Sequence, residues 1–600
     1  MISTLIKRIL LISAITVSVT LLLHSCANRG AGPQGGIRDT TPPQLLKSSQ
    51  SNKATSATNQ RLEWIFDENI QLEKQQENIL VSPPQKQAPT IRAMGKKLSV
   101  AFADSLASNT TYTIDFGNAV VDLNEKNALA NFSWSFATGA TIDTMQLAGY
   151  VIDARTLTPY EGIIVGVYKS NKDSAFVSTP FDYMARTNSQ GFFTIRNIPQ
   201  VPYQVYALKD IPQAFYYDQK GKEIGFFSQK VTPEEVKHLQ TDTIWNDNDT
   251  VSILRIDTSY SISYAPNDLL IKLFREERAM IPTLRRALRP SKESFTLLMS
   301  AALDKEPLIT PINVETSKWL KREQTNRMDS LVYWITDSNA LALDTIQFTV
   351  SYASADSLKT DTIALTYKQP RARTANEKTL QQLEIVSLTK SPVDIADTLR
   401  LQVKEPMKSL NIEKMHLTMR IDTTWHNVPF SLQYDDDNCK KKISVLFDRK
   451  ERANYRLVID SAAIVSDYGK QNTSFVQTFT TKSPDDYASL MIEWKNTPPY
   501  GIVELLDAKE TVVRAVHVSE PTTVLRLLSP GNYFLRLVLD ANQNGKWDTG
   551  SVLPKLEPEE VYYYPKRLVL RANWDSVEEW DYTAIPLLQQ RATELPKSKK

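Results

Sequence analysis

One loop near the C-terminus places oxygen-bearing side chains at regular intervals. They stand at positions 1, 3, 5 and 9 of the segment Asp540, Asn542, Asn544 and Asp548, and Gly545 stands at position 6. Alternating side chains of a tight loop converge on one hard cation, and glycine permits the sharp turn; this is the spacing of a calcium-binding loop. The sequence therefore predicts a calcium site, at which Lys546 would offer its backbone carbonyl.

The same loop departs from the high-affinity pattern. Position 12 is Ser551, where a tight calcium loop has a bidentate glutamate. Glu557 or Glu559 could fold back to complete the ring of ligands. The alternative is an Asx-rich turn between strands, in which the side chains accept hydrogen bonds from their own backbone. The sequence leaves both interpretations open.

Consecutive aromatic residues follow two predicted strands. They are Tyr216, Tyr217, Tyr562, Tyr563 and Tyr564. Successive residues of a strand point to opposite faces, so one ring of each run could face solvent and bind a sugar or a protein. The alternative is packing against the neighbouring sheet, which we also expect for Trp574 and Trp580. These tyrosines are therefore candidate ligand-binding residues.

Catalytic motifs are missing from the sequence. Beyond residue 25 the histidines are His238, His416, His426 and His517, with no His-x-x-x-His pair. No Gly-x-Ser-x-Gly elbow, phosphate-binding glycine loop or dinucleotide fingerprint occurs. We therefore expect no enzyme activity, although a pair of carboxylates brought together by folding stays open.

Cys26 stands where an apolar segment ends. Lys7 lies in a short cationic region, and residues 9–23 are apolar or small but too few to span a membrane. With leucine at −3, a small residue at −1 and cysteine at +1, the segment resembles a lipobox, although His24 at −2 is unusual. We predict a signal peptide at 1–25 and lipid on Cys26. The alternative is an ordinary signal peptide followed by a chance cysteine.

Composition bounds the remaining possibilities. The 600 residues allow about four or five domains. A formal net charge of +2 gives no electrostatic case for nucleic acid as a partner. Besides Cys26 the chain has one cysteine, Cys439, so no disulfide framework exists and each domain depends on its own core.

Apolar residues mostly recur with a period of two. Segments 98–102, 112–116 and 132–136 alternate apolar and polar residues, as half-buried strands do. The fold class is therefore all-β. Helical segments are few: residues 276–288 are one candidate, and 485–488 are expected to form a short turn.

Internal repetition organises the chain. Residues 109–122 are echoed at 452–467, and Tyr203 to Asp210 has the same spacing as Tyr533 to Asp540. A two-domain unit therefore occurs twice around a middle β domain. The predicted parts are a tether (26–43), two domains (44–141 and 145–225), a polar connection (226–261), the middle domain (262–369), two further domains (371–483 and 486–590) and a basic tail (591–600).

Two family resemblances follow from these motifs. Ile65-Phe-Asp-Glu68, Val81-Ser-Pro-Pro and Asn109-Thr-Thr-Tyr-Thr-Ile-Asp-Phe-Gly resemble bacterial Ig-like domains of the S-layer type, which recur in Bacteroidota lipoproteins. Gly149-Tyr-Val-Ile-Asp and Asn188-Ser-Gln-Gly-Phe-Phe-Thr-Ile resemble the prealbumin-like or carboxypeptidase regulatory-like β-sandwich. The resemblance implies tandem sandwiches that serve as spacers or binding modules, and fold alone does not give function.

The sequence thus favours a non-enzymatic, lipid-anchored outer-membrane scaffold or accessory subunit with an outer-membrane protein as its partner. No acidic residue occurs at 27–32, which tilts the expected location towards the periplasmic face over the cell surface. A glycan-binding surface lipoprotein is the alternative, and an enzyme with an unrecognised carboxylate site is the third hypothesis.

Overall fold

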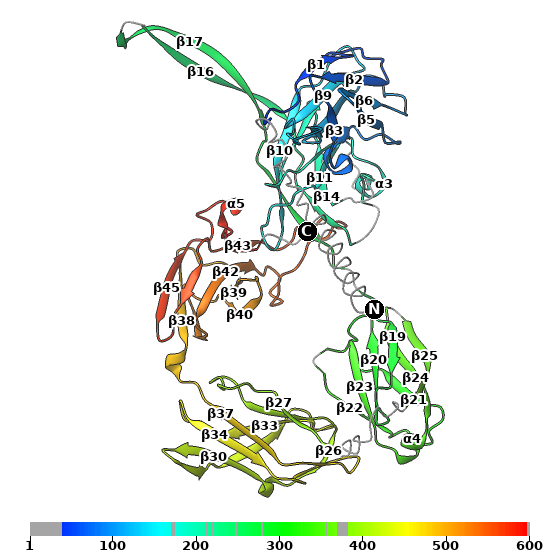
Figure 1. Cartoon of the computed structure of the whole chain (residues 1–600), viewed down its shortest axis with the longest axis vertical. Helices are drawn as coiled ribbons and strands as arrows, with labels where there is room; N and C mark the ends of the chain where they lie inside the picture. Colours follow the sequence, from blue (N-terminus) through cyan, green and yellow to red (C-terminus); the bar gives the residue numbers. More distant parts are fainter. Residues whose placement is uncertain are drawn as a thin grey trace, which may run out of the picture. The chain divides into compact units, whose positions relative to one another are not determined.

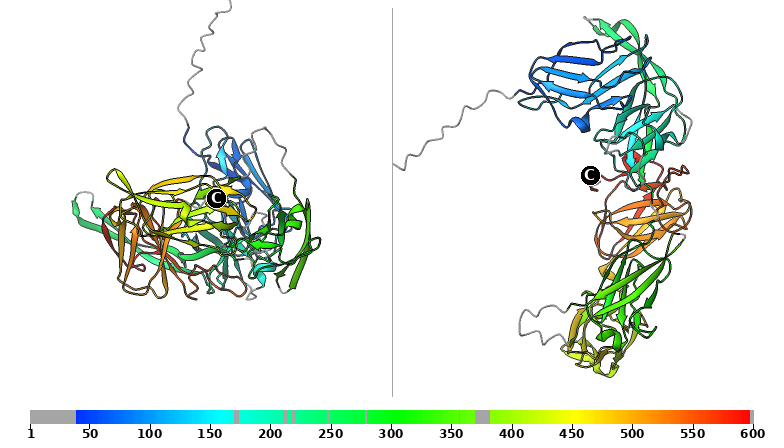
Figure 2. Two further views of the ribbon diagram at one scale, coloured as in Figure 1. Left: turned by 90° about the horizontal axis from the view of Figure 1, so that it is seen from below. Right: turned by 90° about the vertical axis from the view of Figure 1, so that its right-hand side faces the viewer.

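The computed structural model describes residues 39–169, 174–209, 214–217, 221–246, 249–277, 280–325, 327–355, 357–368 and 382–596. Strands form nearly all of its regular structure, as Figure 1 and the two views of Figure 2 show. The predicted all-β class is therefore confirmed. The longest helix of the described residues has five residues, so none is long and apolar enough to cross a membrane. Cys26 and the predicted signal peptide lie outside these residues.

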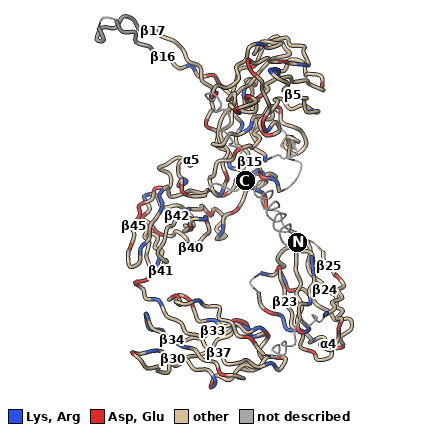
Figure 3. The backbone as a smooth tube through the Cα atoms, in the orientation of Figure 1, with Lys and Arg blue, Asp and Glu red and all other residues tan. Residues whose placement is uncertain are grey.

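The chain divides into two compact units. Unit 1 comprises Met1–Tyr150, Glu161–Tyr216 and Gln229–Leu269, and unit 2 comprises Val151–Tyr160, Tyr217–Ser228 and Leu270–Lys600. The predicted domain 145–225 is thus shared between the two units. Basic and acidic residues are interspersed along both units (Figure 3), in keeping with a formal net charge of +2.

Unit 1 begins with a sandwich of short strands. One sheet has the order β1-β2-β6-β5, a second has the order β4-β7-β9, and β3 pairs with β8. The strands are β1 (Leu45–Ser48), β2 (Arg61–Phe66), β3 (Ile70–Leu72), β4 (Leu80–Ser82), β5 (Thr90–Met94), β6 (Lys97–Ala101), β7 (Thr111–Gly117), β8 (Val120–Asp122) and β9 (Phe132–Ala137), with the short helix α2 (Gln75–Asn78). Trp64 is fully buried and contacts Phe116 and Trp134 edge-on, so aromatic packing fills this core.

The rest of unit 1 contains a second set of strands and a long hairpin. β10 (Met145–Asp153) pairs with β13 (Phe192–Ile198), and β11 (Ile164–Tyr168) lies between β12 (Tyr183–Arg186) and β14 (Gln204–Leu208), with α3 (Ala175–Ser178) preceding β12. The hairpin is formed by β16 (Glu234–Asn246) and β17 (Asp249–Ala265), which pair from Glu234–Ala265 to Asn246–Asp249. Figure 1 shows it extending away from the other strands of its unit.

In unit 2, β15 (Glu223–Phe226) pairs with β18 (Leu269–Arg275), and a middle sandwich follows. Its sheets have the orders β19-β20-β23-β22 and β21-β24-β25. The strands are β19 (Leu284–Leu288), β20 (Ser294–Met299), β21 (Leu308–Pro311), β22 (Leu320–Arg322), β23 (Ser330–Ile335), β24 (Thr345–Ser354) and β25 (Ser357–Thr366). The helix α4 (Ser338–Ala342) begins after Asp337, whose side chain accepts the Ala340 N–H.

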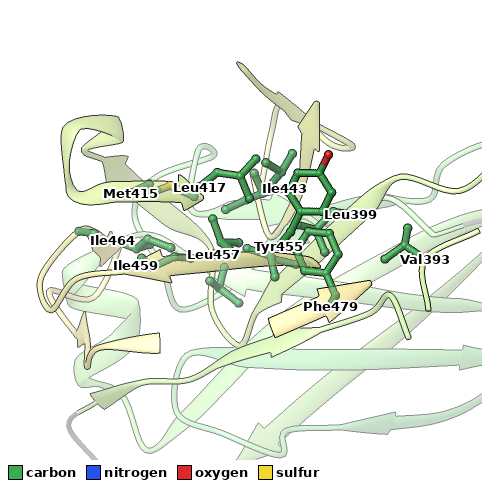
Figure 4. Close-up of a cluster of buried hydrophobic side chains, with 14 of the residues drawn as sticks. Val393, Leu399, Met415, Leu417, Ile443, Tyr455, Leu457, Ile459, Ile464 and Phe479 are labelled. Carbon is green, nitrogen blue, oxygen red and sulfur yellow. The ribbon is translucent and has the colours of Figure 1, made fainter. Parts of the chain in front are cut away.

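The next sandwich of unit 2 has three four-stranded sheets, ordered β26-β36-β35-β29, β27-β28-β33-β32 and β31-β30-β34-β37. The strands are β26 (Gln382–Leu383), β27 (Ile385–Ser387), β28 (Leu399–Val403), β29 (Met407–Leu410), β30 (Met415–Ile421), β31 (Thr424–Asn427), β32 (Phe430–Tyr434), β33 (Lys442–Phe447), β34 (Asn454–Ile459), β35 (Ile464–Ser466), β36 (Gln471–Asn472) and β37 (Phe475–Thr480), with the 3₁₀ turn η2 (Ile412–Lys414). Alternate residues of β34, Tyr455, Leu457 and Ile459, point into the core beside Phe479 (Figure 4).

The C-terminal sandwich of unit 2 follows the 3₁₀ turn η3 (Pro484–Asp486), where the sequence predicts a turn. β38 pairs with β41 and, in parallel, with β45; the other sheet has the order β40-β39-β42-β43, and β44 also pairs with β42. The elements are β38 (Ala488–Trp494), β39 (Gly501–Leu506), β40 (Val512–His517), β41 (Thr522–Leu528), β42 (Gly531–Leu539), β43 (Val561–Tyr563), β44 (Leu568–Leu570), β45 (Asp575–Trp580) and α5 (Leu587–Gln590).

The sandwich of residues 45–137 and the sandwich of residues 382–480 repeat one hydrogen bond. The Tyr112 hydroxyl accepts the N–H of Ala107 at 2.8 Å, and the Tyr455 hydroxyl accepts the N–H of Lys450 at 2.8 Å, five residues upstream in both cases. Each ring also stacks on a phenylalanine of the next strand, Tyr112 on Phe136 and Tyr455 on Phe479, with centroids 5.4 Å apart. The internal repeat predicted from the sequence is therefore built into the cores.

The domains that contain Tyr203 and Tyr533, the second domain of each repeated unit, also repeat a tyrosine contact. The Tyr203 hydroxyl donates to the carbonyl of Pro199 at 3.0 Å, and the Tyr533 hydroxyl donates to the carbonyl of Ser529 at 2.8 Å, four residues upstream in both cases. The strand pairings agree too: β10 with β13 corresponds to β38 with β41, and β11 with β14 corresponds to β39 with β42.

Three sequence-based predictions differ from the structure. The helix predicted at 276–288 is wrong, because residues 284–288 form β19 and pair with β20. The polar connection predicted at 226–261 contains the paired strands β16 and β17. The basic tail predicted at 591–600 is packed in part, because Ala592 and Leu595 are buried and the Arg591 guanidinium pairs with Glu510.

Candidate functional site

The Asp540 loop begins where β42 ends, and its first carboxylate is buried. Asp540 Oδ1 accepts the N–H of Asn544 at 3.0 Å, and Oδ2 accepts the N–H of Gly545 at 2.8 Å. Gly545 has a φ of +81°, a left-handed conformation that favours glycine. The loop therefore winds around the Asp540 side chain, as an Asx turn does.

The predicted ligands of this loop do converge. The side-chain amides of Asn542 and Asn544 both donate to Asp548 Oδ2, and the Lys546 ammonium lies 3.5 Å from Asp548 Oδ1. The Asn542 amide is the first cause of a lowered Asp548 pKa, because it hydrogen-bonds the ionised carboxylate. The structure thus gathers Asp540, Asn542, Asn544 and Asp548 around one small volume.

Glu559 folds back onto this loop, which the sequence offered as one of two possibilities. Its two carboxylate oxygens accept the N–H groups of Ala541 and Asp548, each at 2.9 Å. Burial raises the pKa of Glu559, and the charges of Asp540 and Asp548 raise it further. Glu557 instead hydrogen-bonds the Ser228 hydroxyl. Glu559 is therefore the third carboxylate of the loop.

The donor set suits a hard cation, yet the loop closes with its own hydrogen bonds. Each carboxylate oxygen that accepts one N–H keeps a further lone pair, so a metal is chemically compatible with the three carboxylates and two amide oxygens. In the described part of the chain, however, no three His, Cys, Asp or Glu side chains are arranged to hold a metal ion. Calcium binding stays a prediction.

The candidate tyrosines lie mostly inside the protein. Tyr217, Tyr563 and Tyr564 are buried, and their hydroxyls donate to Glu276, Glu510 and Glu578, respectively. The half-buried Tyr562 donates to Glu560 at 2.7 Å, and Tyr216 is also half-buried. Burial raises the pKa of Tyr217 and of Tyr563 to about 12.

The two tryptophans of the last strands differ. Trp580 is buried and stacks on Trp494 with ring centroids 5.1 Å apart, as expected of a core anchor. Trp574 is 60% exposed, with Arg571 over its ring at 5.4 Å, so the prediction that it is an anchor is wrong. Its turn places the ring on the surface, where the guanidinium covers one side.

A buried charge network was missed by sequence reasoning. Arg536 Nε donates to Glu504 at 2.5 Å, and its Nη1 donates to the Tyr563 hydroxyl at 3.2 Å. Glu510 accepts from Tyr563 and pairs with Arg591, which completes the network. These residues are far apart in sequence, so no local spacing could have signalled their contact.

A cavity of about 630 Å³ lies on the middle sandwich. Its walls include Glu306, Trp319, Arg322 and Tyr333, with Asp436 of the following sandwich. The Arg322 guanidinium pairs with Glu306 at 3.2 Å. The cavity is therefore polar. The residues that line it belong to neither the Asp540 loop nor the strands with the candidate tyrosines.

The four histidines have no histidine partner among the contacts of the described residues. His238 contacts the Ser263 hydroxyl, His416 lies 3.4 Å from Asp460 Oδ2, and His426 contacts the Thr424 hydroxyl. Gly545 lies near the His517 ring. These contacts are those of surface histidines.

Comparison with known proteins gives a family match for the first sandwich. Residues 39–138 match the family model of the bacterial Ig-like domain. Among curated proteins, none matches the chain. Similar solved structures include the S-layer protein rSbsC(31-844) (9% identity, 83% of this chain and 65% of that chain, TM-score 0.12) and the human Desmocollin-1 ectodomain (10% identity, 72% and 80%, TM-score 0.14).

The likeness to these structures is limited to the presence of β domains. The chain spans less than two thirds of rSbsC(31-844) and 42% of a Salmonella alpha-2-macroglobulin, to which it is 10% identical over 87% of its own length with a TM-score of 0.13. Scores this low carry no argument about the arrangement of the domains. The family model and the sheets together identify the first sandwich, and only that sandwich, as a bacterial Ig-like domain.

Proposed function

We propose that the chain is a non-enzymatic lipoprotein of the outer membrane that acts as a scaffold or accessory binding subunit of an envelope protein complex. The observation that carries this proposal is that the candidate tyrosines and carboxylates hydrogen-bond within their own sandwich. The hydroxyls of Tyr563 and Tyr564 and the carboxylates around Asp540 make contacts that hold their own sandwich together. Repeated sandwiches extend surface and reach without requiring a pocket.

Anchorage belongs to the same proposal. Lipid on Cys26 attaches the chain to the outer membrane of a Bacteroidota-like cell, and the tether 26–43 separates the first sandwich from the lipid. Because no acidic residue follows Cys26 at 27–32, the periplasmic face is favoured over the cell surface. Calcium in the Asp540 loop would stiffen the C-terminal sandwich only.

The test is purification of the tagged full-length chain from membranes in mild detergent, beside a Cys26→Ser variant. We expect the wild-type chain to fractionate with the outer membrane together with a defined, stoichiometric outer-membrane protein, and the variant to leave the membrane fraction. A wild-type chain that purifies alone from crosslinked and uncrosslinked cells would refute the scaffold proposal.

Glycan binding is the second candidate function. The polar cavity of about 630 Å³, with Arg322 and Glu306 in its wall, is the observation that favours it. A glycan binder should be retained on polysaccharide gels and released by free sugar, and Arg322→Ala should abolish that retention. If Tyr562→Ala abolished it instead, the tyrosine strands would be the binding site.

A further inference from the structure

The hairpin of β16 and β17 is exposed on both faces where its side chains are described. Leu239, Tyr260 and Ile262 are 60%, 69% and 54% exposed, and the described residues contribute no third strand to this sheet. A two-stranded hairpin is marginally stable alone in water, and sheets usually need three or more strands with a covered face. The hairpin can therefore be stabilised by a further strand or by a covering surface.

One face of the hairpin mixes apolar and charged side chains, and the other is mostly polar. Directly paired residues share a face, so Leu239 opposite Tyr260 and Lys237 opposite Ile262 lie on one side. On the other side, His238 pairs with Ser261 and its ring contacts the Ser263 hydroxyl at 2.7 Å. A partner would thus gain apolar contacts on one side only.

The two edges of the hairpin differ in charge. Over its first residues β16 carries Glu234, Glu235 and Lys237, and charged side chains on an edge strand oppose the pairing of a further strand. Over residues 258–265 β17 reads Thr-Ser-Tyr-Ser-Ile-Ser-Tyr-Ala, with no charge. The free edge of β17 is therefore the one suited to receive another strand.

The area of a hairpin face limits what can bind there. The 13 residues of β16 at about 3.3 Å each, and a width of about 10 Å, give each face roughly 400 Å². Two copies of the chain packed face to face would bury roughly 800 Å² in total, below the roughly 1,200 Å² of a stable specific interface. A face contact between two copies is thus too small, and an occupant must also use the strand edge.

We propose that the free edge of β17 binds an extended, uncharged segment of another envelope protein, which adds to the hairpin as a third strand. Backbone hydrogen bonds between the two strands contribute affinity, and apolar side chains of the partner pack against Tyr260 and Ile262 and contribute specificity. This inference rests on the proposed scaffold function and names its binding surface.

The test uses a photo-crosslinking amino acid in place of Tyr260, Ile262 or Leu239 in the full-length chain in intact cells, with crosslinked residues mapped by mass spectrometry. We expect positions 260 and 262 to crosslink to residues two apart in one partner segment, because side chains on one face of a strand alternate. Position 239, on the far strand, should give weak or no adducts with that segment.

Thr258 and Thr241 provide a matched pair of variants, since they face each other across the ladder and both are exposed. Thr258→Lys should lower the crosslinked yield from position 260 by about fivefold or more, and Thr241→Lys should leave it nearly unchanged. Hydrogen exchange of the hairpin amides checks that both variants still form it.

The outcomes separate this inference from the proposed function. An equal loss of yield in both variants, or crosslinks without two-residue spacing, would overturn strand addition. If the chain co-purifies with a stoichiometric envelope protein but positions 260 and 262 give no adduct, the scaffold function stands and the β17 site is wrong. If no envelope protein co-purifies at all, both are wrong.

Discussion

In the first copy of the repeated unit, Tyr206 of β14 stacks on Phe176 of α3 with ring centroids 4.2 Å apart. Gly166, opposite Tyr206 on β11, leaves room for Phe181, since a Cβ there would lie 2.1 Å from that ring. In the second copy the corresponding positions hold Arg536 and Glu504, which form a buried ion pair. One strand pair is therefore covered by aromatic packing in one copy and by charges in the other.

The difference follows from the segment that covers the strands. In the first copy the cover is α3 and the residues after it, which present phenylalanines. In the second copy Glu510 and Arg591 lie against Tyr563, and the Arg536 guanidinium lies over the ring of the same tyrosine. A duplicated ladder thus keeps its backbone pairing while the residues on its outer face change with the chain that packs there.

The largest effect is expected from the cores that the copies share. Phe136→Ala and Phe479→Ala should each destabilise their own sandwich by about 3–5 kcal/mol, because both rings are buried and stacked on a tyrosine. Hydrogen exchange of the full chain should show faster exchange in the altered copy only. Loss of protection in both copies together would mean that the copies do not fold independently.

The buried ion pair of Glu504 and Arg536 should contribute to the stability of the C-terminal sandwich, and the first copy has no such pair at the corresponding positions. Glu504→Ala leaves the Arg536 guanidinium buried without its carboxylate and should cost about 3–5 kcal/mol. Thermal unfolding of the C-terminal sandwich measures this. The control is Glu504→Leu combined with Arg536→Met, which removes both charges and should be less destabilising than Glu504→Ala. A double variant as unstable as the single one would show that packing, not charge, sets the cost.

Calcium should act on the second copy alone. If the Asp540 loop binds the ion, calcium at 100 times its dissociation constant should stabilise the C-terminal sandwich by about 2.7 kcal/mol. A variant with both Asp540→Ala and Asn542→Ala should lose this response. Unfolding of the first copy, monitored in the same chain, is the internal control. Identical melting of wild type and variant with and without calcium would refute the metal site.

The smallest expected effect is common to the sandwiches that contain Tyr112 and Tyr455. Tyr112→Phe and Tyr455→Phe each remove one hydroxyl that accepts a backbone N–H at 2.8 Å. Each should cost about 0.5–1.5 kcal/mol, since the amide loses its partner. Equal losses, measured by denaturant unfolding, would support equivalent roles for the two tyrosines. A loss in one copy only would show that this contact is conserved in geometry but not in energy.

Alternation of apolar and polar residues was enough to predict the sandwiches, because it decides which side chains are buried. Segment 454–459 shows this: its tyrosine, leucine and isoleucine all enter one core. The convergence of Asp540, Asn542 and Asp548 was also predictable, because local spacing fixes it.

Long-range contacts and local propensity explain what was missed. Residues 276–288 contain good helix formers, yet pairing of 284–288 with β20 determines a strand. The β16–β17 hairpin was missed although Tyr260, Ile262 and Tyr264 alternate with serines at 259–264, the period of a strand. Arg591 meets Glu510 across 81 residues, a contact that no local pattern encodes.

The proposed function requires that the repeated sandwiches present binding surfaces to an outer-membrane protein. The most direct test is the mass of the full-length chain purified from membranes in mild detergent, compared with the mass of the chain alone. The account predicts a stoichiometric complex with an outer-membrane protein that Thr258→Lys weakens and Thr241→Lys leaves intact. A chain that runs alone at the mass of a single copy in its detergent micelle, with both variants identical to it, would contradict the account.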